Sequence, residues 1–486
     1  MKILFSHSYY YPLDEKQWAK KQPYPPLGTI QAAAYLRQLG HEVALFDTNL
    51  IDSPVYIQQD LESFQPELLV IYDDGFNYLT KMCLTNMREA AFDMIALAKK
   101  RGIQVAVSSS DSTDQFNMYL DAGADFVLLG EAEETLKELA DNLKKNSDTS
   151  GVLGIVSRME SETQNSGRRT VMRNLDSLPI PAWDLIDIDA YRKIWLGGNG
   201  YFSLNMSTTR GCPYKCNWCA KPIYGQKYNS RSPEHVVREI EYLLNHHKPT
   251  HFWMCDDIFG LKPGWVQEFD HLIQERKLKF TYTIQSRVDL LLKEDTIGAL
   301  SSSGIHEVWV GAESGSQKVL DSMDKGTQVE QIYEATRMLK SKGVRIAFFL
   351  QFGYPEETKN DIQKTIDMVL ELMPDNIGVS VSYPLPGTPF YERVKSELNS
   401  KANWKDSDDL DLMFSNSYPK EYYRKLQRYI HKRLRLKQGA LNGRAIFSHP
   451  FAVNWQKIRS VALFPYYGIS SRMDKKSLDK MEAQVL

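Results

Sequence analysis

The sequence predicts an α/β protein with a doubly wound parallel sheet, a partial (β/α)6 barrel and a mostly helical carboxyl-terminal extension. Short apolar runs alternate with amphipathic helical patterns over residues 1 to about 140, and again from about 203 to 395. The remainder lacks this alternation. We therefore expect domains at 1–143 and 201–395, a wrapping linker at 144–200 and an extension at 396–486.

The first domain contains the strand-like runs KILFS, HEVALFD, PELLVIYDD, IQVAVSSS and DFVLLGE. Continuous apolar strands of this kind are typical of parallel sheets that helices cover on both faces. In such sheets ligands bind at the carboxyl ends of the strands. These ends are rich in small and polar residues such as Ser108, Ser109 and Ser110, although ordinary turns favour the same residues.

Six successive strand-helix units predict the barrel, from FSLNMSTTRG to NIGVSVSYPLPGTP. In such barrels the chemistry takes place on loops at the carboxyl ends of the strands. The extension has a basic run around Lys420 to Arg444, which predicts a helix packed on the barrel. Peripheral contact with anionic lipid is the alternative for this run. The residues expected to pack are Tyr422, Leu426, Tyr429 and Leu436.

The composition describes a soluble globular protein. A formal net charge of -2 gives no electrostatic case for nucleic acid as a partner. The amino terminus resembles neither a signal peptide nor a transit peptide, and no segment offers about 18 successive apolar residues. We therefore expect a cytoplasmic protein, in which the five cysteines would remain thiols.

Three of these cysteines, Cys212, Cys216 and Cys219, share one short loop with the spacing Cys-x3-Cys-x2-Cys. A structural zinc site would need a fourth ligand nearby, and the closest histidines belong to the next predicted helix. A 4Fe-4S cluster normally takes four thiolates, so three would leave one iron open to a substrate. We favour the cluster, and we expect Cys83 and Cys255 to be buried as small hydrophobic residues.

The loop STTRGCPYKCNWCAKPIYG resembles that of the radical S-adenosylmethionine (SAM) enzymes. The resemblance to this family covers about residues 200–395. The resemblance implies a 4Fe-4S cluster on the three cysteines and SAM beside it. The motifs WMCDDIF, QSRVD and VGAESGSQKVL look like the family's second, third and fourth strand ends. Contacts with SAM are implied for Trp218, Asp256, Asp257, Arg287, Gly311, Glu313 and Ser314.

Each polar residue of this set also has an ordinary structural explanation. Asp256 and Asp257 could cap a helix, Arg287 could form a surface ion pair, and Glu313 could be an exposed loop carboxylate. On the resemblance, the reduced cluster would cleave SAM to a 5'-deoxyadenosyl radical that takes hydrogen from an unactivated carbon. An electron donor such as flavodoxin or ferredoxin is then implied.

The first domain resembles the cobalamin-binding domain that precedes the barrel in one radical SAM subgroup. The resemblance rests on YPPLGTIQAAAYLRQLGHEVALFD, SSS at 108–110 and GEAEETLKEL. It departs in one respect, because the motif Asp-x-His-x-x-Gly is missing, so cobalamin is expected without a protein histidine ligand. Contacts with cobalamin are implied for Gly28, Ser109, Ser110, Gly130 and Glu131.

The function expected from these resemblances is a cobalamin-dependent methyltransferase acting on an unactivated carbon of a small-molecule, lipid or peptide substrate. The alternative within enzymes is a radical rearrangement or oxidation without functional cobalamin. A third reading is a metal-stabilised protein that binds or modifies RNA, against which the near-neutral charge argues.

Overall fold

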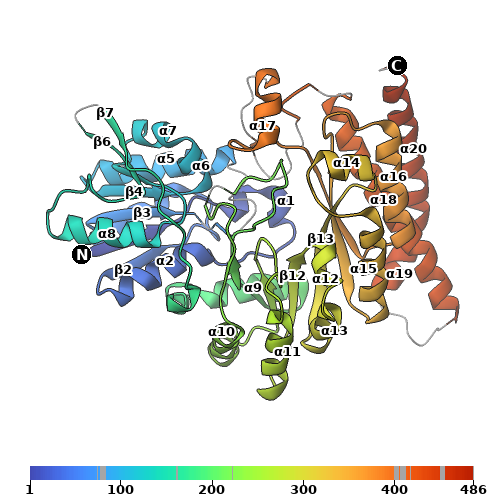
Figure 1. The fold of residues 1–486 in the computed structure, drawn as a ribbon, viewed down its shortest axis with the longest axis horizontal. Coiled ribbons are helices and arrows are strands. Elements are labelled where there is room, and N and C mark those ends of the chain that lie inside the picture. The colour runs from blue at the N-terminus through green and yellow to red at the C-terminus, as the bar shows by residue number, and fades with distance from the viewer. Residues whose placement is uncertain are drawn as a thin grey trace.

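The computed structural model describes residues 1–73, 75–76, 84–159, 162–221, 223–398, 404–405, 412–415, 418–448 and 455–484. Figure 1 shows the first domain on the left, the barrel strands in the centre and the carboxyl-terminal helices on the right. The predicted order of a doubly wound sheet, a six-stranded partial barrel and a helical extension is confirmed.

The first sheet has the strand order β2-β1-β3-β4-β5-β6-β7. The strands β1 to β5 are parallel, and β6 and β7 continue the sheet in antiparallel pairing. Because β1 lies between β2 and β3, the chain reverses its direction of winding there, and such a switch point is where ligands bind in this kind of sheet. The strands are β1 Lys2–Ser6, β2 Glu42–Phe46, β3 Leu68–Tyr72, β4 Gln104–Ser108, β5 Phe126–Leu128, β6 Ile155–Met159 and β7 Glu162–Asn165.

Helices cover both faces of this sheet, because its strands are apolar on both sides. Ile3 and Phe5 pack with α2 and α8, whereas Leu4 packs with α3 and α5 on the opposite face. The helices of the domain are η1 Tyr11–Leu13, α1 Glu15–Trp18, α2 Leu27–Gln38, η2 Pro54–Tyr56, α3 Ile57–Phe64, α5 Thr85–Lys99, α6 Ser110–Asp114, α7 Phe116–Asp121 and α8 Glu133–Lys144.

The segment 144–200, expected to be a linker, contributes β6 and β7 to the first sheet before it crosses to the barrel. Its later part packs in the barrel core and is hydrogen-bonded to the first domain. The Tyr191 hydroxyl donates to Asp47 Oδ2 (2.7 Å), and Trp195 Nε1 donates to the carbonyl of Pro23 (2.7 Å). This part contains η3 Leu175–Ser177, η4 Trp183–Leu185 and α9 Ile188–Asn199.

The barrel strands form one parallel sheet in the order β15-β14-β13-β12-β11-β8. The strands are β8 Ser203–Met206, β11 His251–Met254, β12 Thr281–Ser286, β13 Ile305–Glu313, β14 Arg345–Phe352 and β15 Asn376–Val381, with the short pair β9 Thr209–Arg210 and β10 Asn229–Ser230. The helices are α10 Pro233–His246, α11 Trp265–Glu275, α12 Val288–Leu291, α13 Thr296–Ser302, α14 Gln317–Ser322, α15 Val329–Ser341, α16 Lys359–Leu372, α17 Pro389–Val394 and η5 Lys395–Glu397.

The loop between β1 and α2 covers the open edge of the barrel at β8. Tyr24 packs against Trp253 of β11 (ring centroids 4.9 Å apart), and its hydroxyl lies 3.1 Å from Ser203 Oγ. Asn205 Nδ2 donates to the carbonyl of Pro25 (3.0 Å). A loop of the first domain therefore covers the open edge of the barrel, although no strand of the first domain joins the barrel sheet.

The extension forms α18 Lys420–Ser448, α19 Trp455–Ala462 and α20 Phe464–Glu482. Tyr422, Leu426 and Tyr429 are buried and Leu436 is half-buried, so the basic run is a helix packed on the barrel as expected. In the part of the chain that the structure describes, no helix has the length and apolarity needed to cross a membrane.

Candidate active site

The three clustered cysteines lie in the loop that follows β9, at the carboxyl ends of the barrel strands. Gly211 has a φ of +78°, and a Cβ there would lie 2.4 Å from the carbonyl oxygen of Lys227, so only glycine fits the start of this loop. All three thiols are partly buried. Burial raises the pKa of Cys219 to about 11, so a cluster must displace its proton to bind the thiolate.

Asn217 fixes this loop from both its backbone and its side chain. Its N–H donates to the carbonyl of Met323 (3.1 Å), and its Nδ2 donates to the carbonyl of Ser322 (2.8 Å). Its Oδ1 accepts from the Tyr354 hydroxyl (2.8 Å). The loop is therefore held rigidly to the ends of α14 and β14, although the sequence analysis did not single out Asn217.

Asp256 holds the segment that leads into the cysteine loop. Its carboxylate accepts from the backbone N–H groups of Thr208 and Thr209 (both 2.7 Å) and from the Thr208 hydroxyl (2.7 Å). Burial raises its pKa to about 6, although these donors oppose the shift. Asp256 therefore bridges β11 and β8 and caps no helix, whereas its neighbour Asp257 is exposed beside the thiols.

Arg287 is buried and joins two loops of the site. Its guanidinium lies 3.7 Å from the ring centroid of Tyr214, in the cysteine loop. Its Nη1 donates to the carbonyl of Lys325 (2.9 Å), and its Nε donates to Asp289 Oδ1 (2.9 Å). This is not the surface ion pair that the sequence left open.

Glu313 is also buried, at the end of β13, and Lys325 Nζ donates to its Oε1 (2.7 Å). A Cβ at Gly311 would lie 2.5 Å from this Nζ, so the glycine leaves the space that the pair occupies. Burial alone would lower the pKa of Lys325, but Glu313 and the nearby Cys216 raise it. The lysine is therefore cationic beside the cysteine loop.

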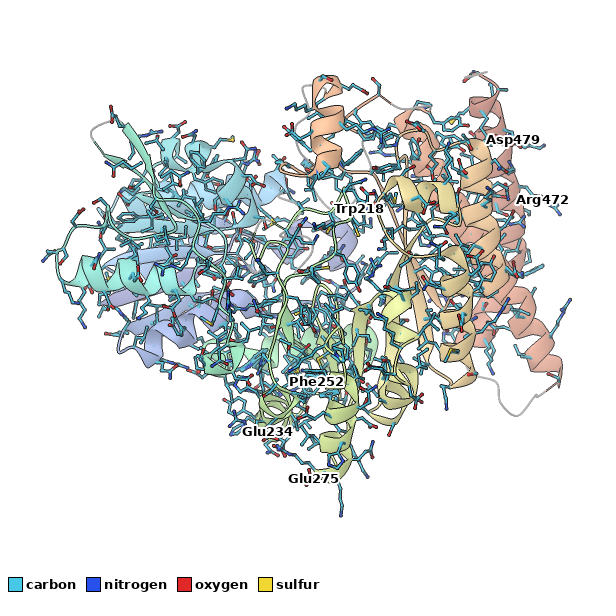
Figure 2. The ribbon with its side chains drawn as sticks, in the orientation of Figure 1. Trp218, Glu234, Phe252, Glu275, Arg472 and Asp479 are labelled. Atoms are coloured by element: carbon cyan, nitrogen blue, oxygen red, sulfur yellow. The ribbon has the colours of Figure 1, made fainter. Side chains whose placement is uncertain are left out.

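Trp218 lies next to this pair, with Lys325 Nζ 5.9 Å from its ring centroid. In Figure 2 it lies well above Phe252 of β11, towards the carboxyl ends of the barrel strands. Its Nε1 is buried and has no hydrogen-bond partner among the described residues. A buried donor without an acceptor is costly, and a bound cofactor would supply the missing group.

Residues 206–369 match the Radical SAM superfamily. This chain is a radical SAM enzyme. The match confirms the predicted 4Fe-4S cluster and SAM, which this superfamily uses. The residues present fit them, since one rigid loop supplies three thiols and leaves the fourth corner free.

Two curated relatives of this radical SAM enzyme cover most of its length. An uncharacterized methyltransferase of Pyrococcus horikoshii is 27% identical over 83% of this chain and 86% of the relative. An anaerobic magnesium-protoporphyrin IX monomethyl ester cyclase of Synechocystis sp. is 24% identical over 76% of this chain and 73% of the relative.

Two solved structures share the fold of this radical SAM enzyme. The methyltransferase TsrM of Kitasatospora setae, with cobalamin and a 4Fe-4S cluster bound, has a TM-score of 0.68 at 17% identity and covers 81% of this chain and 74% of TsrM. The cobalamin-dependent SAM radical enzyme OxsB, with aqua-cobalamin bound, has a TM-score of 0.73 at 18% identity and covers 98% of this chain and 72% of OxsB.

Ser314 of the radical SAM domain is fully buried and contacts its own fold. Its Oγ lies 3.0 Å from Thr365 Oγ1 of α16 and accepts from the N–H of Ser316 (3.1 Å). A Cβ at Gly315 would lie 2.5 Å from the carbonyl oxygen of Lys364. The segment after Glu313 is thus pressed against α16, and the contact of Ser314 with SAM stays a prediction.

The residues expected around cobalamin lie at the carboxyl edge of the first sheet or next to it. Gly28 is in the first turn of α2. Ser109 caps α6 by a reciprocal pair of hydrogen bonds with Ser112, and Ser110 is buried behind it. Gly130 follows β5 with a φ of +71°. The space at these strand ends is thus lined by small residues, and their contact with cobalamin stays a prediction.

The same edge meets the cysteine loop of the radical SAM domain through Arg210. The Arg210 guanidinium donates to Glu131 Oε1 (2.6 Å) and Glu133 Oε1 (2.7 Å), and all three side chains are buried. It also lies 5.4 Å from the ring centroid of Tyr224. Burial and the charge of Glu133 raise the pKa of Glu131, because two carboxylates share one cation.

Lys325, Asn217 and Arg210 were missed by the sequence analysis, and the position of Cys83 lies outside the described residues. Lys325 stands in the polar turn SMDKGT, which reads as an exposed loop, and Arg210 belongs to no periodic pattern. Only the folded chain brings them to the site. Cys255 is buried, as expected.

Proposed function

We propose that this radical SAM enzyme uses cobalamin and methylates an unactivated carbon of a small-molecule, lipid or peptide substrate. The observation that carries the proposal is the junction between the two domains. Arg210, two residues before Cys212, is ion-paired with Glu131 and Glu133 at the carboxyl edge of the first sheet. A cofactor held at that edge would therefore face the cysteine loop.

A second contact supports the same arrangement. Phe76, which follows β3, lies 5.8 Å from Tyr224 of the segment after the cysteines, measured between ring centroids. The switch point of the sheet lies between β1 and β3, so the crevice where such sheets bind ligands opens beside this contact. The relatives named as methyltransferases and the cobalamin-bound neighbours agree with this proposal.

Each domain would hold its own cofactor. Cys212, Cys216 and Cys219 would bind the cluster, and Trp218, Glu313 and Lys325 would border SAM. Asp256, Arg287 and Ser314 would keep the surrounding loops in place, with Asp257 at the exposed rim and Gly311 leaving room for the buried pair. Gly28, Ser109, Ser110, Gly130 and Glu131 are proposed for cobalamin, the last while paired with Arg210.

Cobalamin would supply a cobalt centre that accepts and gives up a methyl group, while the protein provides orientation and a dry site. The buried Lys325 cation would hold anionic groups, because a charge inside a low-dielectric site acts more strongly than in water. Arg287 and Asn217 would keep the cysteine loop from moving as charge changes on it.

A non-methylating radical reaction is the second candidate. The relative named as a magnesium-protoporphyrin ester cyclase supports it, because this name describes a ring closure. In that case the first domain would serve as a substrate cover.

The test uses protein reconstituted anaerobically with iron, sulfide and cobalamin, together with reductant and SAM carrying a trideuterated methyl group. Metabolite, lipid and peptide extracts of a deletion strain serve as substrate sources. We expect a product that gains one trideuterated methyl group. A product formed without the label would support the second candidate instead.

The proposal also includes an electron donor such as flavodoxin or ferredoxin, a cytoplasmic location and peripheral contact with a membrane. We also propose that the domains meet near residues 143, 200 and 395. Purification of the tagged protein from its own cells would test the electron donor.

A further inference from the structure

The helices α19 and α20 form the outermost layer of the extension, at the end of the molecule far from the first domain (Figure 1). Their inner face packs on α18, where a Cβ at Gly439 would lie only 2.9 Å from the carbonyl oxygen of Ser460. Ser471 and Leu478 of α20 are buried on this side. The opposite side faces away from the rest of the chain.

That opposite side carries a continuous apolar row, which we call the outer stripe. Its members are exposed and repeat at intervals of three or four residues, so they share one face of a helix. The backbone continues helically across the junction, since Leu463 N–H donates to the carbonyl of Arg459 and Tyr467 N–H to that of Leu463. The outer stripe consists of Trp455, Ile458, Ala462, Tyr466, Ile469 and Met473.

The exposure of this stripe is high for such side chains. Trp455 is 74% exposed, Ile469 63% and Met473 67%. Single exposed apolar residues are common on protein surfaces, but a row along five turns of helix is a patch that marks an interaction site.

Cations without acidic partners surround the outer stripe. Lys476 and Lys480 continue the helix face of Met473 by one and two further turns, and both are exposed. Arg472 projects at the outer edge of α20 in Figure 2. Within the described residues, no ion pair is formed by the exposed cations Arg459, Arg472, Lys476 and Lys480.

Each acidic residue of these two helices is already ion-paired, and only Asp479, whose partner Lys475 lies on α20 itself, has a well exposed side chain (50%). Asp474 pairs with Lys432 of α18 (2.6 Å), Asp479 with Lys475 (2.6 Å) and Glu482 with Lys359 (2.6 Å). The outward side of α19 and α20 is therefore apolar along its centre and positively charged at its flanks.

We propose that the outer stripe docks this protein on the surface of an anionic phospholipid bilayer. Aromatic and aliphatic side chains enter the boundary between headgroups and acyl chains, while flanking lysines and arginines meet the lipid phosphates. This assigns the membrane contact to α19 and α20, because α18 is packed against the barrel and its Lys432 and Lys437 are engaged with the fold. The inference does not depend on methyl transfer.

A second copy of the chain fits this surface less well. An identical face would bring the same cations towards each other, and every carboxylate that the structure describes on α19 and α20 is already paired. Anionic lipid complements both the apolar centre and the charged flanks.

The test is co-sedimentation of the full-length reconstituted enzyme with vesicles of phosphatidylcholine alone or mixed with phosphatidylglycerol, at low and high salt. We expect binding to the anionic vesicles only, weakened by salt. Lys476→Gln with Lys480→Gln should weaken binding about thirtyfold, given roughly 1 kcal/mol for each Lys or Arg near an anionic surface. Ile469→Glu with Met473→Glu should abolish it.

The matched control is Met338→Glu, which charges an exposed methionine (40%) on α15 and should leave vesicle binding unchanged. Iron content and SAM cleavage, measured on every variant, show whether the fold and the proposed chemistry survive. Equal binding by the wild type and by the Ile469→Glu, Met473→Glu variant would overturn the proposal. So would concentration-dependent dimerisation that this variant abolishes, together with no vesicle binding.

Discussion

Arg210 and Glu131 form a buried ion pair with a nitrogen to oxygen distance of 2.6 Å, and it joins the carboxyl edge of the first sheet to the loop of the cluster cysteines. Glu133 completes the contact at 2.7 Å from the other guanidinium nitrogen. This contact ties the edge proposed for cobalamin to the cysteine loop through a side chain that stands two residues from Cys212.

The first prediction concerns this pair. Arg210→Met leaves two carboxylates buried without a cation, so it should lower the free energy of unfolding by about 3–5 kcal/mol. Urea unfolding under anaerobic conditions measures this change. The control is Arg276→Met, because Arg276 also bridges two glutamates, Glu234 and Glu241, but at the surface. Its loss should cost at most about 1 kcal/mol. Equal costs for both substitutions would contradict the account.

The second prediction concerns the buried pair of Glu313 and Lys325. Glu313→Ala should weaken SAM binding by about 1–3 kcal/mol, the cost of losing a charge-assisted hydrogen bond, with iron content retained. Lys325→Met should weaken it by a similar amount. Equilibrium dialysis with labelled SAM measures both. Glu307→Ala, at the amino end of the same strand, should bind as the wild type does. Unchanged affinity in Glu313→Ala would make this pair purely structural.

The third prediction is a pH dependence that arises from His251. Burial, with a smaller effect of His306, lowers the pKa of His251 to about 3, from 6.5 in the unfolded chain. The ring contacts Ser203 Oγ (2.8 Å) and Thr283 Oγ1 (3.0 Å). Because the folded state favours the neutral ring, this stability is present above pH 6.5 and is lost as the pH falls from 6.5 towards 3.

Urea unfolding between pH 7.5 and about 5.5 measures this effect. As the pH is lowered, the free energy of unfolding should decrease less steeply in His251→Asn than in the wild type. The exposed His271→Asn variant should keep the wild-type slope. Parallel curves for His251→Asn and the wild type would show that His251 contributes nothing to the pH dependence.

The fourth prediction is that bound cobalamin has no protein histidine below its cobalt. The candidate ligand in the first domain is His7, and both of its ring nitrogens are engaged in hydrogen bonds. Its Nε2 lies 3.0 Å from Asp47 Oδ1, and its Nδ1 lies 3.1 Å from Thr48 Oγ1. We expect the cofactor's own base to be displaced as well, so electron paramagnetic resonance of the Co(II) form should show no nitrogen splitting, in the wild type or in His7→Ala. A nitrogen triplet that disappears in His7→Ala would show that His7 is the ligand.

The sequence alone predicted the features whose signal lies in a short stretch of residues. The three cysteines lie within eight residues, and the apolar runs of β3 and β14 define buried parallel strands without further context. The antiparallel pair β6 and β7 was not predicted, because β7 has the sequence ETQN and is exposed throughout. Nothing apolar marks it as a strand.

The site was predictable only in part, for the same physical reason. Glu313 stands in a recognisable motif, but its partner Lys325 follows twelve residues later in a polar turn, and burial alone identifies it. Asp256 was predicted near the cofactor, whereas its hydrogen bonds to Thr208 and Thr209 come from the pairing of β11 with β8. Contacts between strands depend on register, and a single sequence does not specify it.

The central claim is that Cys212, Cys216 and Cys219 hold a cluster that cleaves SAM. The most direct measurement is the iron content of anaerobically reconstituted protein, together with the 5'-deoxyadenosine formed from SAM after reduction. We predict about four irons and 5'-deoxyadenosine for the wild type. Neither should be found for Cys212→Ala, Cys216→Ala or Cys219→Ala. Cys83→Ala and Cys255→Ala, the controls outside the loop, should keep both. Full cleavage of SAM by any of the three loop variants would contradict the account.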